Sequence, residues 1–388
     1  MSYWRWMLTD ILTLARDRAI ALTLFGGVLF YAVLYPLPYI HDVATEQSVA
    51  VVDLDNSSLS RQMIRYADAS PQVKIVARAG SVDEARAMID QNQAKGLLVI
   101  PANFRHDLLR GQQVTLSFAG DASYFLIYSA IVQGLTTAGL DVGSQLQLQG
   151  LLANGTLPAA AARQVAPVAL NDVAVFNQGL GYPAYVIPGL FLLILHQTLF
   201  IGMGILGAGQ WRQTGYWQQF SPLTTVCLRM ASFSVIYAFL SAFYIGWCYY
   251  YYDVGRQAAL GQVLLLMLPF LLATAAAGMA FSTLFVRREL PTQVMLLSSM
   301  PILFVAGFVW PLSIIPAPLV WISQLVPAVP GMMAMLQLNQ MGASWSQVLP
   351  LWLQLWGVCG LYLLLAVWGV HRRRQALAAQ LAEYSEKH

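Results

Sequence analysis

The segment FVWPLSIIPAPLVWISQLVPAVPGM (Phe308–Met332) lies inside a stretch of about 80 residues, between Glu289 and His371, without aspartate, glutamate, lysine or arginine. Such a stretch is too apolar for a soluble loop, and it is too long for one membrane span, which takes roughly 20 apolar residues. Its prolines interrupt any continuous helix. The sequence therefore predicts short interfacial or re-entrant helices at about 311–348, which occur only where protein or a cavity covers the unpaired backbone.

The whole chain has a composition that suits a bilayer. Of its 388 residues, 58% are hydrophobic and 10% are charged, and the mean hydropathy is +0.59. Soluble domains carry about 25% charged residues. No basic stripe indicates a nucleic-acid site. The cysteines Cys227, Cys248 and Cys359 lie in apolar segments, so they cannot form the framework of a small secreted disulfide protein.

Six apolar regions are predicted as transmembrane helices, and they make the chain a polytopic α-helical membrane protein. They cover about residues 19–40, 183–209, 226–250, 258–285, 290–310 and 349–370. A signal peptide is the alternative for the first region, but its apolar part is roughly 7–15 residues long and ends at a cleavage site with small residues. Here the run is longer and ends in YPLPYIHD, which favours an uncleaved span.

Residues 1–18 predict an amphipathic helix in the plane of the membrane interface. Its apolar side is expected to hold Trp4, Met7, Ile11, Leu14 and Ala15 at helical spacing. The polar side is expected to hold Arg5, Asp10, Arg16, Asp17 and Arg18.

Arginines at the ends of the apolar regions predict the orientation. In a six-span arrangement one side collects Arg5, Arg16, Arg18, Arg212, Arg229, Arg287, Arg288 and the run Arg372–Arg374. The positive-inside rule places that side in the cytoplasm. Both termini, with the tail at 372–388, are then cytoplasmic. Residues 41–181, which hold 12 acidic and 9 basic residues, are placed outside.

The segment 41–181 predicts an inserted extracytoplasmic α/β domain. The runs SVAVVDLD, VKIVARA, GLLVIP and QVTLSFAG (48–55, 73–79, 96–101 and 113–120) are typical of strands. Helical stretches at 57–69, 81–92 and 102–111 alternate with them, which indicates an α/β layer. A long helical arm follows at about 123–166, interrupted by Asn154-Gly155-Thr156, which matches a glycosylation acceptor but favours a turn. ALNDVAVFN (169–177) predicts a last strand-like piece.

Two hypotheses fit the acidic pair Asp53 and Asp55 after the first strand. In a haloacid-dehalogenase-type phosphatase, such a pair supplies a nucleophile and a general acid beside magnesium. That chemistry also needs a downstream lysine and further acids, and neither Lys74 nor Lys95 has a recognisable context. The favoured hypothesis is structural, with the next helix capped by Asn56, Ser57 or Ser58 and with Asp55 near its positive end.

The sequence has no phosphate loop of the form Gly-x-x-x-x-Gly-Lys-Ser/Thr. The chain is therefore not expected to be an enzyme that hydrolyses ATP by that route. Ionisable groups at depth, which would indicate a proton- or sodium-driven carrier, are limited to His196. If the chain transports a substrate, the energy is expected to come from a separate subunit.

Four segments together resemble the permeases of ABC-2 type exporters, in the branch with a large extracytoplasmic domain after the first span. These are VAVVDLDNSSLSRQM (49–63), the helical arm, NQGLGYPAYVIPG (177–189) and the proline-rich segment. The resemblance implies an efflux permease of the bacterial inner membrane, paired with a second permease as a homodimer or heterodimer. It also implies cytoplasmic ABC ATPase subunits that bind ATP and magnesium, with no cofactor in this chain, and a membrane-fusion adaptor with an outer-membrane duct.

In that family the ATPase docks on the loop between the second and third spans, here GQWRQTGYWQQFSPL (209–223). The resemblance assigns ATPase coupling to Trp211, Arg212, Gly215, Trp217, Phe220 and Pro222. The loop departs from the family in carrying Arg212 as its single charge. Its aromatic rings are therefore expected to seat in an ATPase groove by apolar contact. An interfacial aromatic belt is the alternative.

The candidate translocation path consists of His196, Gln197, Thr292 and Gln293 in the second and fifth spans. A few polar groups among apolar ones suit an amphipathic or lipid-like substrate, and interhelical hydrogen bonding explains them equally well. The favoured function is a permease of an ATP-driven exporter. The alternatives are a non-transporting membrane platform whose outer domain binds a cell-envelope partner, and a membrane-tethered phosphatase.

Overall fold

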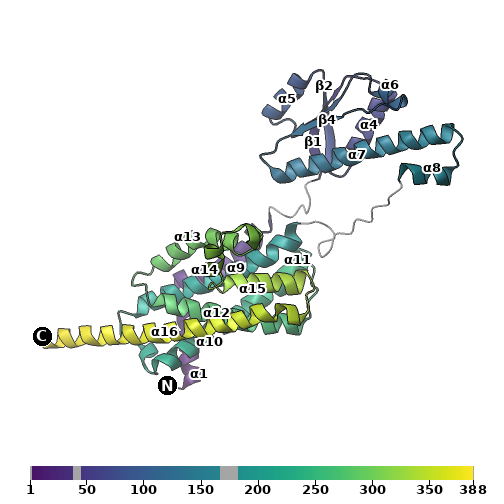
Figure 1. Cartoon of the computed structure of the whole chain (residues 1–388). Helices are drawn as coiled ribbons and strands as arrows, with labels where there is room; N and C mark the ends of the chain where they lie inside the picture. Colours follow the sequence, from purple (N-terminus) through teal and green to yellow (C-terminus); the bar gives the residue numbers. More distant parts are fainter. Residues whose placement is uncertain (1, 38–44, 167–181, 388) are drawn as a thin grey trace. The chain divides into compact units, whose positions relative to one another are not determined.

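The computed structural model describes residues 2–37, 45–166 and 182–387, which form two compact units (Figure 1). The membrane-type unit comprises Met1–Asp42 and Ala174–His388, and the outer unit comprises Val43–Val173. The predicted strand at 169–177 lies outside the described residues.

The N-terminal segment of the membrane-type unit is sharply bent at Asp17. Helix α1 (Tyr3–Arg16) ends there, and a second helical run begins, composed of α2 (Arg18–Ala21), π-helical η1 (Leu22–Gly27) and α3 (Val28–Leu34). The carboxylate of Asp17 accepts hydrogen bonds from the amides of Ala19 (3.1 Å) and Ile20 (3.3 Å). This cap satisfies free amides at the start of α2, and the two runs meet at 81°.

Among the described residues, four helical runs are long and apolar enough to cross a membrane, or up to six if each bent pair counts as one span. The four lie in α9 (Tyr182–Gln210), in α10 (Pro222–Ala242) with η4 (Phe243–Cys248) and α11 (Tyr249–Tyr251), in α12 (Leu260–Ser282), and in α16 (Trp345–Lys387). The prediction of a full span at 290–310 was wrong in length. Helix α13 (Leu290–Val305) has 16 residues and rises about 24 Å, less than the roughly 30 Å hydrocarbon core.

Short helices form the proline-rich segment, as the proline spacing predicted. They are η5 (Leu312–Ile314), α14 (Ala317–Ser323), α15 (Ala328–Met335) and π-helical η6 (Leu336–Gln340). A bend of 90° separates Ala317–Ser323 from Ala328–Gln340. Helix α15 is almost wholly buried. Gly331 permits this packing, because a Cβ there would lie 2.5 Å from Cδ2 of Phe270.

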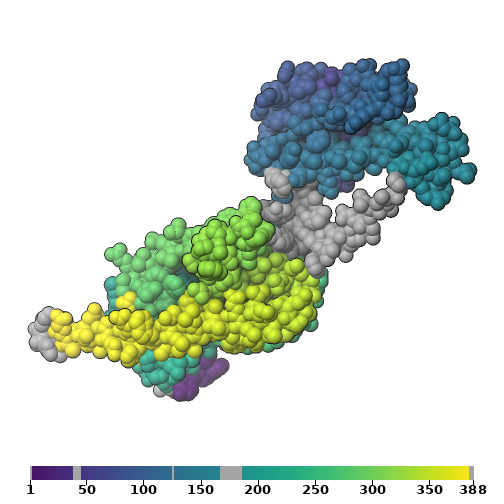
Figure 2. Space-filling view, viewed as in Figure 1, coloured from purple at the N-terminus to yellow at the C-terminus, as the bar shows by residue number. Residues whose placement is uncertain are grey.

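Helix α9 runs through the core of the membrane-type unit, whereas α16 lies along its surface (Figure 2). Two glycines bring α9 against α13 and the chain that follows it. A Cβ at Gly204 would lie 2.5 Å from Cβ of Pro291, and a Cβ at Gly189 would lie 2.4 Å from the ring of Phe308. Gly204 comes later in the chain than Gly189, whereas its partner Pro291 comes earlier than Phe308. The two segments therefore run antiparallel.

The outer unit contains a four-stranded sheet in the order β2-β1-β3-β4. Its strands are β1 (Gln47–Asp53), β2 (Val73–Ala79), β3 (Gly96–Ile100) and β4 (Ser117–Gly120). Strand β1 pairs in parallel with β2 and β3, and β4 is antiparallel to β3. The fourth strand begins at Ser117 and not at residue 113, because 112–116 make no ladder.

The described part of this unit also contains five helices: α4 (Ser58–Asp68), α5 (Val82–Asp90), α6 (Phe104–Leu109), α7 (Phe125–Ala153) and α8 (Pro158–Val165). Alternate residues of β1 serve two cores. Val49 and Val51 pack with residues of α4 and α7, while Ala50 and Val52 pack with Ala85 of α5. This is the side-chain period of two that a buried strand requires. The predicted turn at 154–156 is confirmed, with Gly155 at φ 82°.

Candidate functional site

The acidic pair of the outer unit organises a turn. Asp53 Oδ1 accepts hydrogen bonds from the amides of Asp55 (3.2 Å) and Asn56 (2.9 Å), and its Oδ2 accepts one from Ser60 Oγ (2.8 Å). Ser57 Oγ caps α4 by accepting from the amides of the second and third residues after it, at 3.2 and 3.1 Å. The capping prediction is therefore confirmed, with Ser57 as the cap.

Replacing Asp53 with alanine is expected to lower the local stability of this turn by about 1–3 kcal/mol, because three donors lose their acceptor. Asp53→Asn keeps the side-chain shape and one carbonyl oxygen, so its effect is expected to be smaller. Hydrogen exchange of the amides at 55–60 in the purified full chain measures both. Wild-type protection in the alanine variant would contradict the structural role. Magnesium-dependent phosphatase activity that is lost in Asp53→Asn would support the enzymatic alternative.

The four candidate path residues lie at two different levels of the α9–α13 pair. His196 is buried, Gln197 and Thr292 are half-buried, and Gln293 is exposed. Since Pro291 packs against Gly204 and the two helices are antiparallel, Thr292 lies about 10 Å along the axis from His196, at 1.5 Å per residue. Within the described chain, neither ring nitrogen of His196 has a hydrogen-bond partner. The four residues do not form one polar lining, and the path stays a prediction.

The loop at 211–221, between α9 and α10, turns two of its aromatic rings inward. Trp211 and Trp217 are 3% and 2% exposed, and their rings meet edge to face at 5.3 Å. Trp211 Nε1 donates a hydrogen bond to the carbonyl of Ser282 at the end of α12 (2.7 Å). The predicted apolar docking through these two rings is therefore corrected, because their own chain already covers them. The loop exposes Arg212, Gln213, Thr214, Gly215 and Gln219 instead.

The remaining predicted coupling residues shape the loop. A Cβ at Gly215 would lie 3.1 Å from Cδ1 of Trp217, so a larger residue would press on that ring. Phe220 is half-buried, with its ring 5.0 Å from that of Tyr3. Pro222 occupies the first turn of α10 after the N-cap Ser221, a position that proline tolerates because no amide is needed there.

Arg374 of α16 holds the loop from another side. Its guanidinium donates hydrogen bonds to the carbonyls of Trp217 (2.5 Å) and Phe220 and to Thr225 Oγ1 (2.7 Å). The guanidinium carbon also lies 5.5 Å from the centre of the Trp217 ring, within range of a cation–π contact. Thr225 Oγ1 in turn donates to the Trp217 carbonyl at 3.1 Å. One arginine of the last helix thereby fixes the backbone of the loop.

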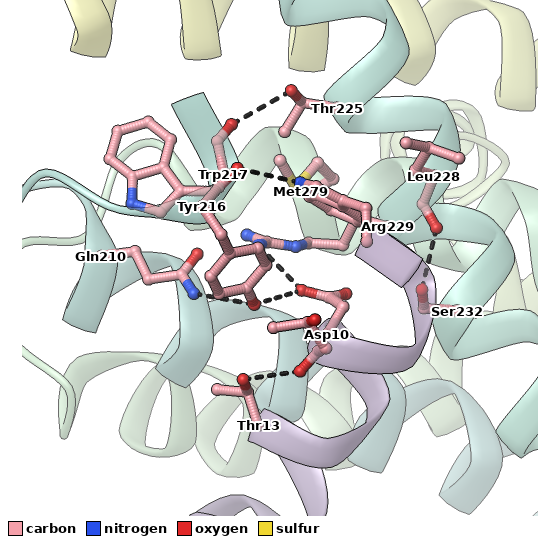
Figure 3. Close-up of polar contacts among 12 residues, drawn as sticks. Asp10, Thr13, Gln210, Tyr216, Trp217, Thr225, Leu228, Arg229, Ser232 and Met279 are labelled. Atoms are coloured by element: carbon pink, nitrogen blue, oxygen red, sulfur yellow. Dashed lines mark hydrogen bonds and ion pairs between the residues drawn. The ribbon is translucent and has the colours of Figure 1, made fainter. Parts of the chain in front are cut away.

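A buried ion pair links α1 to α10 directly beneath the same loop (Figure 3). Asp10 Oδ1 lies 3.0 Å from Arg229 Nη2, and both side chains are fully buried. Tyr216 donates its hydroxyl to the same oxygen of Asp10 at 2.6 Å, and Trp6 Nε1 donates to the Tyr216 carbonyl at 3.0 Å. These contacts correct the predicted polarity of α1, whose buried face consists of Trp6, Asp10 and Leu14. Asp10 lies on that face because Arg229 neutralises it there.

The buried charges of Asp10 and Arg229 make this group of residues sensitive to substitution. Burial is the main cause that raises the pKa of Tyr216, and the Asp10 carboxylate raises it further, so the phenol stays protonated and donates. Among the residues the structure describes, Asp10 Oδ2 and the Nε and Nη1 atoms of Arg229 have no hydrogen-bond partner. A partly satisfied buried network is costly to maintain and more costly to break.

Sequence reasoning missed the pairing of Asp10 with Arg229 and Tyr216, and it missed the contacts of Arg374 with the loop. One signal for a buried ion pair was present. Arg229 lies in an apolar helix and needs an acidic partner, and a chain with 10% charged residues offers few acidic residues to choose from. Its partner is 219 residues away, and nothing in the local pattern specifies that distance.

Comparison with known proteins agrees with this architecture. The family described as "ABC-2 family transporter protein" matches residues 18–368, which is most of the chain. A search of curated proteins finds no match. Members of the family are membrane components that work with an ABC ATPase. The long apolar helices and the extent of the match show that this chain belongs to the ABC-2 family of transporter proteins, as a permease.

Proposed function

We propose that the chain exports an amphipathic substrate by ATP-driven movement of the loop at 211–221, with the ATPase on a separate cytoplasmic subunit. One observation supports this proposal most directly: the loop is hydrogen-bonded to four helices. Trp211 bonds to α12, Arg374 bonds from α16, Thr225 of α10 bonds to the Trp217 carbonyl, and Trp6 of α1 bonds to Tyr216. A force on the loop would therefore reach four helices at once.

The exposed residues of the loop are the proposed contact for the ATPase, and the buried rings transmit the displacement. Packed interiors move as units because they are nearly as dense as crystals of small molecules. The substrate would then pass between this permease and a second, identical or related permease. An adaptor and an outer-membrane duct remain expectations from the family.

Charge distribution supports a cytoplasmic position for the loop. Arg288 forms an ion pair with Asp17, Arg373 donates to the carbonyl of Thr283 (2.6 Å), and Arg374 binds the loop. These contacts gather the arginines of several helices at one end of the unit, which the positive-inside rule assigns to the cytoplasm. The proposed location is the bacterial inner membrane, with both termini inside.

A cysteine at Thr214 is expected to cross-link to the ATPase subunit in the assembled transporter, because Thr214 is exposed on the proposed contact surface. The background should lack the exposed Cys227. Gln257→Cys is the control, since Gln257 is exposed and lies in the chain between η4 and α12 at the other end of those helices. Cross-linking from Gln257 and not from Thr214 would overturn the proposed orientation.

One observation favours the platform alternative. A cavity of about 590 Å³ in the outer unit is lined by α5 and strands β3 and β4, with the exposed Phe118 on its wall. Such a hollow suits a partner segment. Substrate-stimulated ATPase activity together with efflux from proteoliposomes would decide for the exporter.

A further inference from the structure

An elongated groove runs between the second half of α10, with η4, and the first half of α12. Its volume is about 330 Å³, roughly twice that of the ~150 Å³ apolar cavity known to hold a benzene molecule. Most of the wall is apolar, with Ile245, Val263, Met267 and Leu271 among the lining residues. The polar exceptions are Ser234, Ser241 and Arg256.

The groove is about as long as one leaflet is thick, and it opens on the surface of the helix bundle. Its wall on α10 and η4 extends from Ser234 to Gly246, which is about 18 Å at 1.5 Å per residue. Half of a bilayer core is about 15 Å. Lining residues Ala238, Leu264 and Leu268 are exposed, so the mouth faces outward from the helix bundle. Arg256 stands at the end of the groove where α12 begins.

Two hydroxyl groups in the groove lack the partner that serine usually finds in a helix. Ser232 and Ser282 donate to carbonyls of their own helices, at 3.0 and 2.7 Å. Ser234 Oγ and Ser241 Oγ are buried and have no hydrogen-bond partner within the described residues, and Ser241 is only 5% exposed. An unsatisfied buried hydroxyl is unfavourable, so a polar group of a ligand at this depth would stabilise it. The π-helical η4 begins two residues later, and such segments are frequent at functional sites.

The positive charge of Arg256 at the end of the groove favours a ligand with an anionic head group. Arg256 is exposed and forms no ion pair with any described residue. A guanidinium binds phosphate with strong, directional hydrogen bonds. We propose that the groove holds one acyl chain of an anionic phospholipid from the surrounding bilayer, with its phosphate on Arg256 and its ester region near Ser241.

The test measures lipid retained by the purified full chain with native mass spectrometry, after exchange into phosphatidylglycerol or phosphatidylcholine. Gly246 lines the groove and a Cβ there meets no atom within 4 Å, so Gly246→Leu is expected to place its side chain in the groove. It is expected to reduce bound phosphatidylglycerol by about tenfold, equivalent to about 1.4 kcal/mol. Gly360→Leu is the matched control, since Gly360 on α16 is equally open and lies outside the groove.

Arg256→Gln tests the contribution of the positive charge to lipid binding separately from that of the apolar cavity. It is expected to abolish the preference for phosphatidylglycerol over phosphatidylcholine while the acyl chain still binds. Equal retention in Gly246→Leu and Gly360→Leu would overturn the proposal, and so would an unchanged lipid preference in Arg256→Gln. Cross-linking of two copies through Gly246→Cys would show that a second copy of the chain occupies the groove instead.

Discussion

Replacing Arg229 with leucine is expected to destabilise the membrane-type unit by about 3–5 kcal/mol, because the variant leaves a buried charge without its counter-ion. The remaining charge is Asp10, which is fully buried on α1. Tyr216 would still donate to it, but a neutral donor replaces only part of the lost interaction. The measurement is thermal unfolding of the purified chain in a fixed detergent. Arg212→Leu, at an exposed loop position, is the control and should stay within about 0.5 kcal/mol of wild type.

The double variant Asp10→Leu with Arg229→Leu tests what the pair contributes. Replacing both partners of a buried pair by apolar residues is often neutral or stabilising, so most of the lost stability is expected to return. Export is expected to remain impaired in the double variant, because α1 loses its charged link to α10 and to Tyr216. A double variant as unstable as Arg229→Leu would show that the pair itself does not account for the loss. Full export by a stable double variant would show that the link is not needed for coupling.

The elements that the sequence predicts well are those whose signal is local. Strand β1 follows from its β-branched run and the turn residues after Asp53, and the short helices at 312–340 follow from proline spacing. The end of α13 at Val305 was not predicted, because the residues up to Trp310 are as apolar as those within the helix. Hydropathy alone does not mark that boundary.

The candidate site shows where local reasoning stops. Family resemblance pointed to the loop at 209–223, and its coupling role stays a prediction. The direction of its rings depends on partners far along the chain, such as Ser282 for Trp211 and Arg374 for Trp217. The same holds for Asp10, which amphipathic spacing assigned to the polar side of α1. A charged residue can occupy a buried face when its partner is supplied by another helix, and one sequence does not reveal that partner.

Replacing Arg374 with glutamine is expected to release the loop from α16 and to uncouple ATP hydrolysis from export. Glutamine is shorter and has one donor group for the three acceptors that Arg374 now serves. Hydrogen bonds to a charged group contribute about 1.5–3 kcal/mol each, so the expected loss of stability is at least about 2 kcal/mol. In a reconstituted transporter, the ratio of substrate exported to ATP hydrolysed is expected to fall.

Arg372→Gln is the matched control for that experiment, because Arg372 lies on the same helix turn and contacts only the exposed face of Trp368 among the interactions described, at 4.9 Å. Both variants remove one positive charge from the same end of α16, so a general effect of charge on membrane orientation would appear in both. Uncoupling in Arg374→Gln alone would place the cause in the loop contacts. A wild-type export ratio in Arg374→Gln would show that the loop moves independently of α16, and the proposed transmission through four helices would then be wrong.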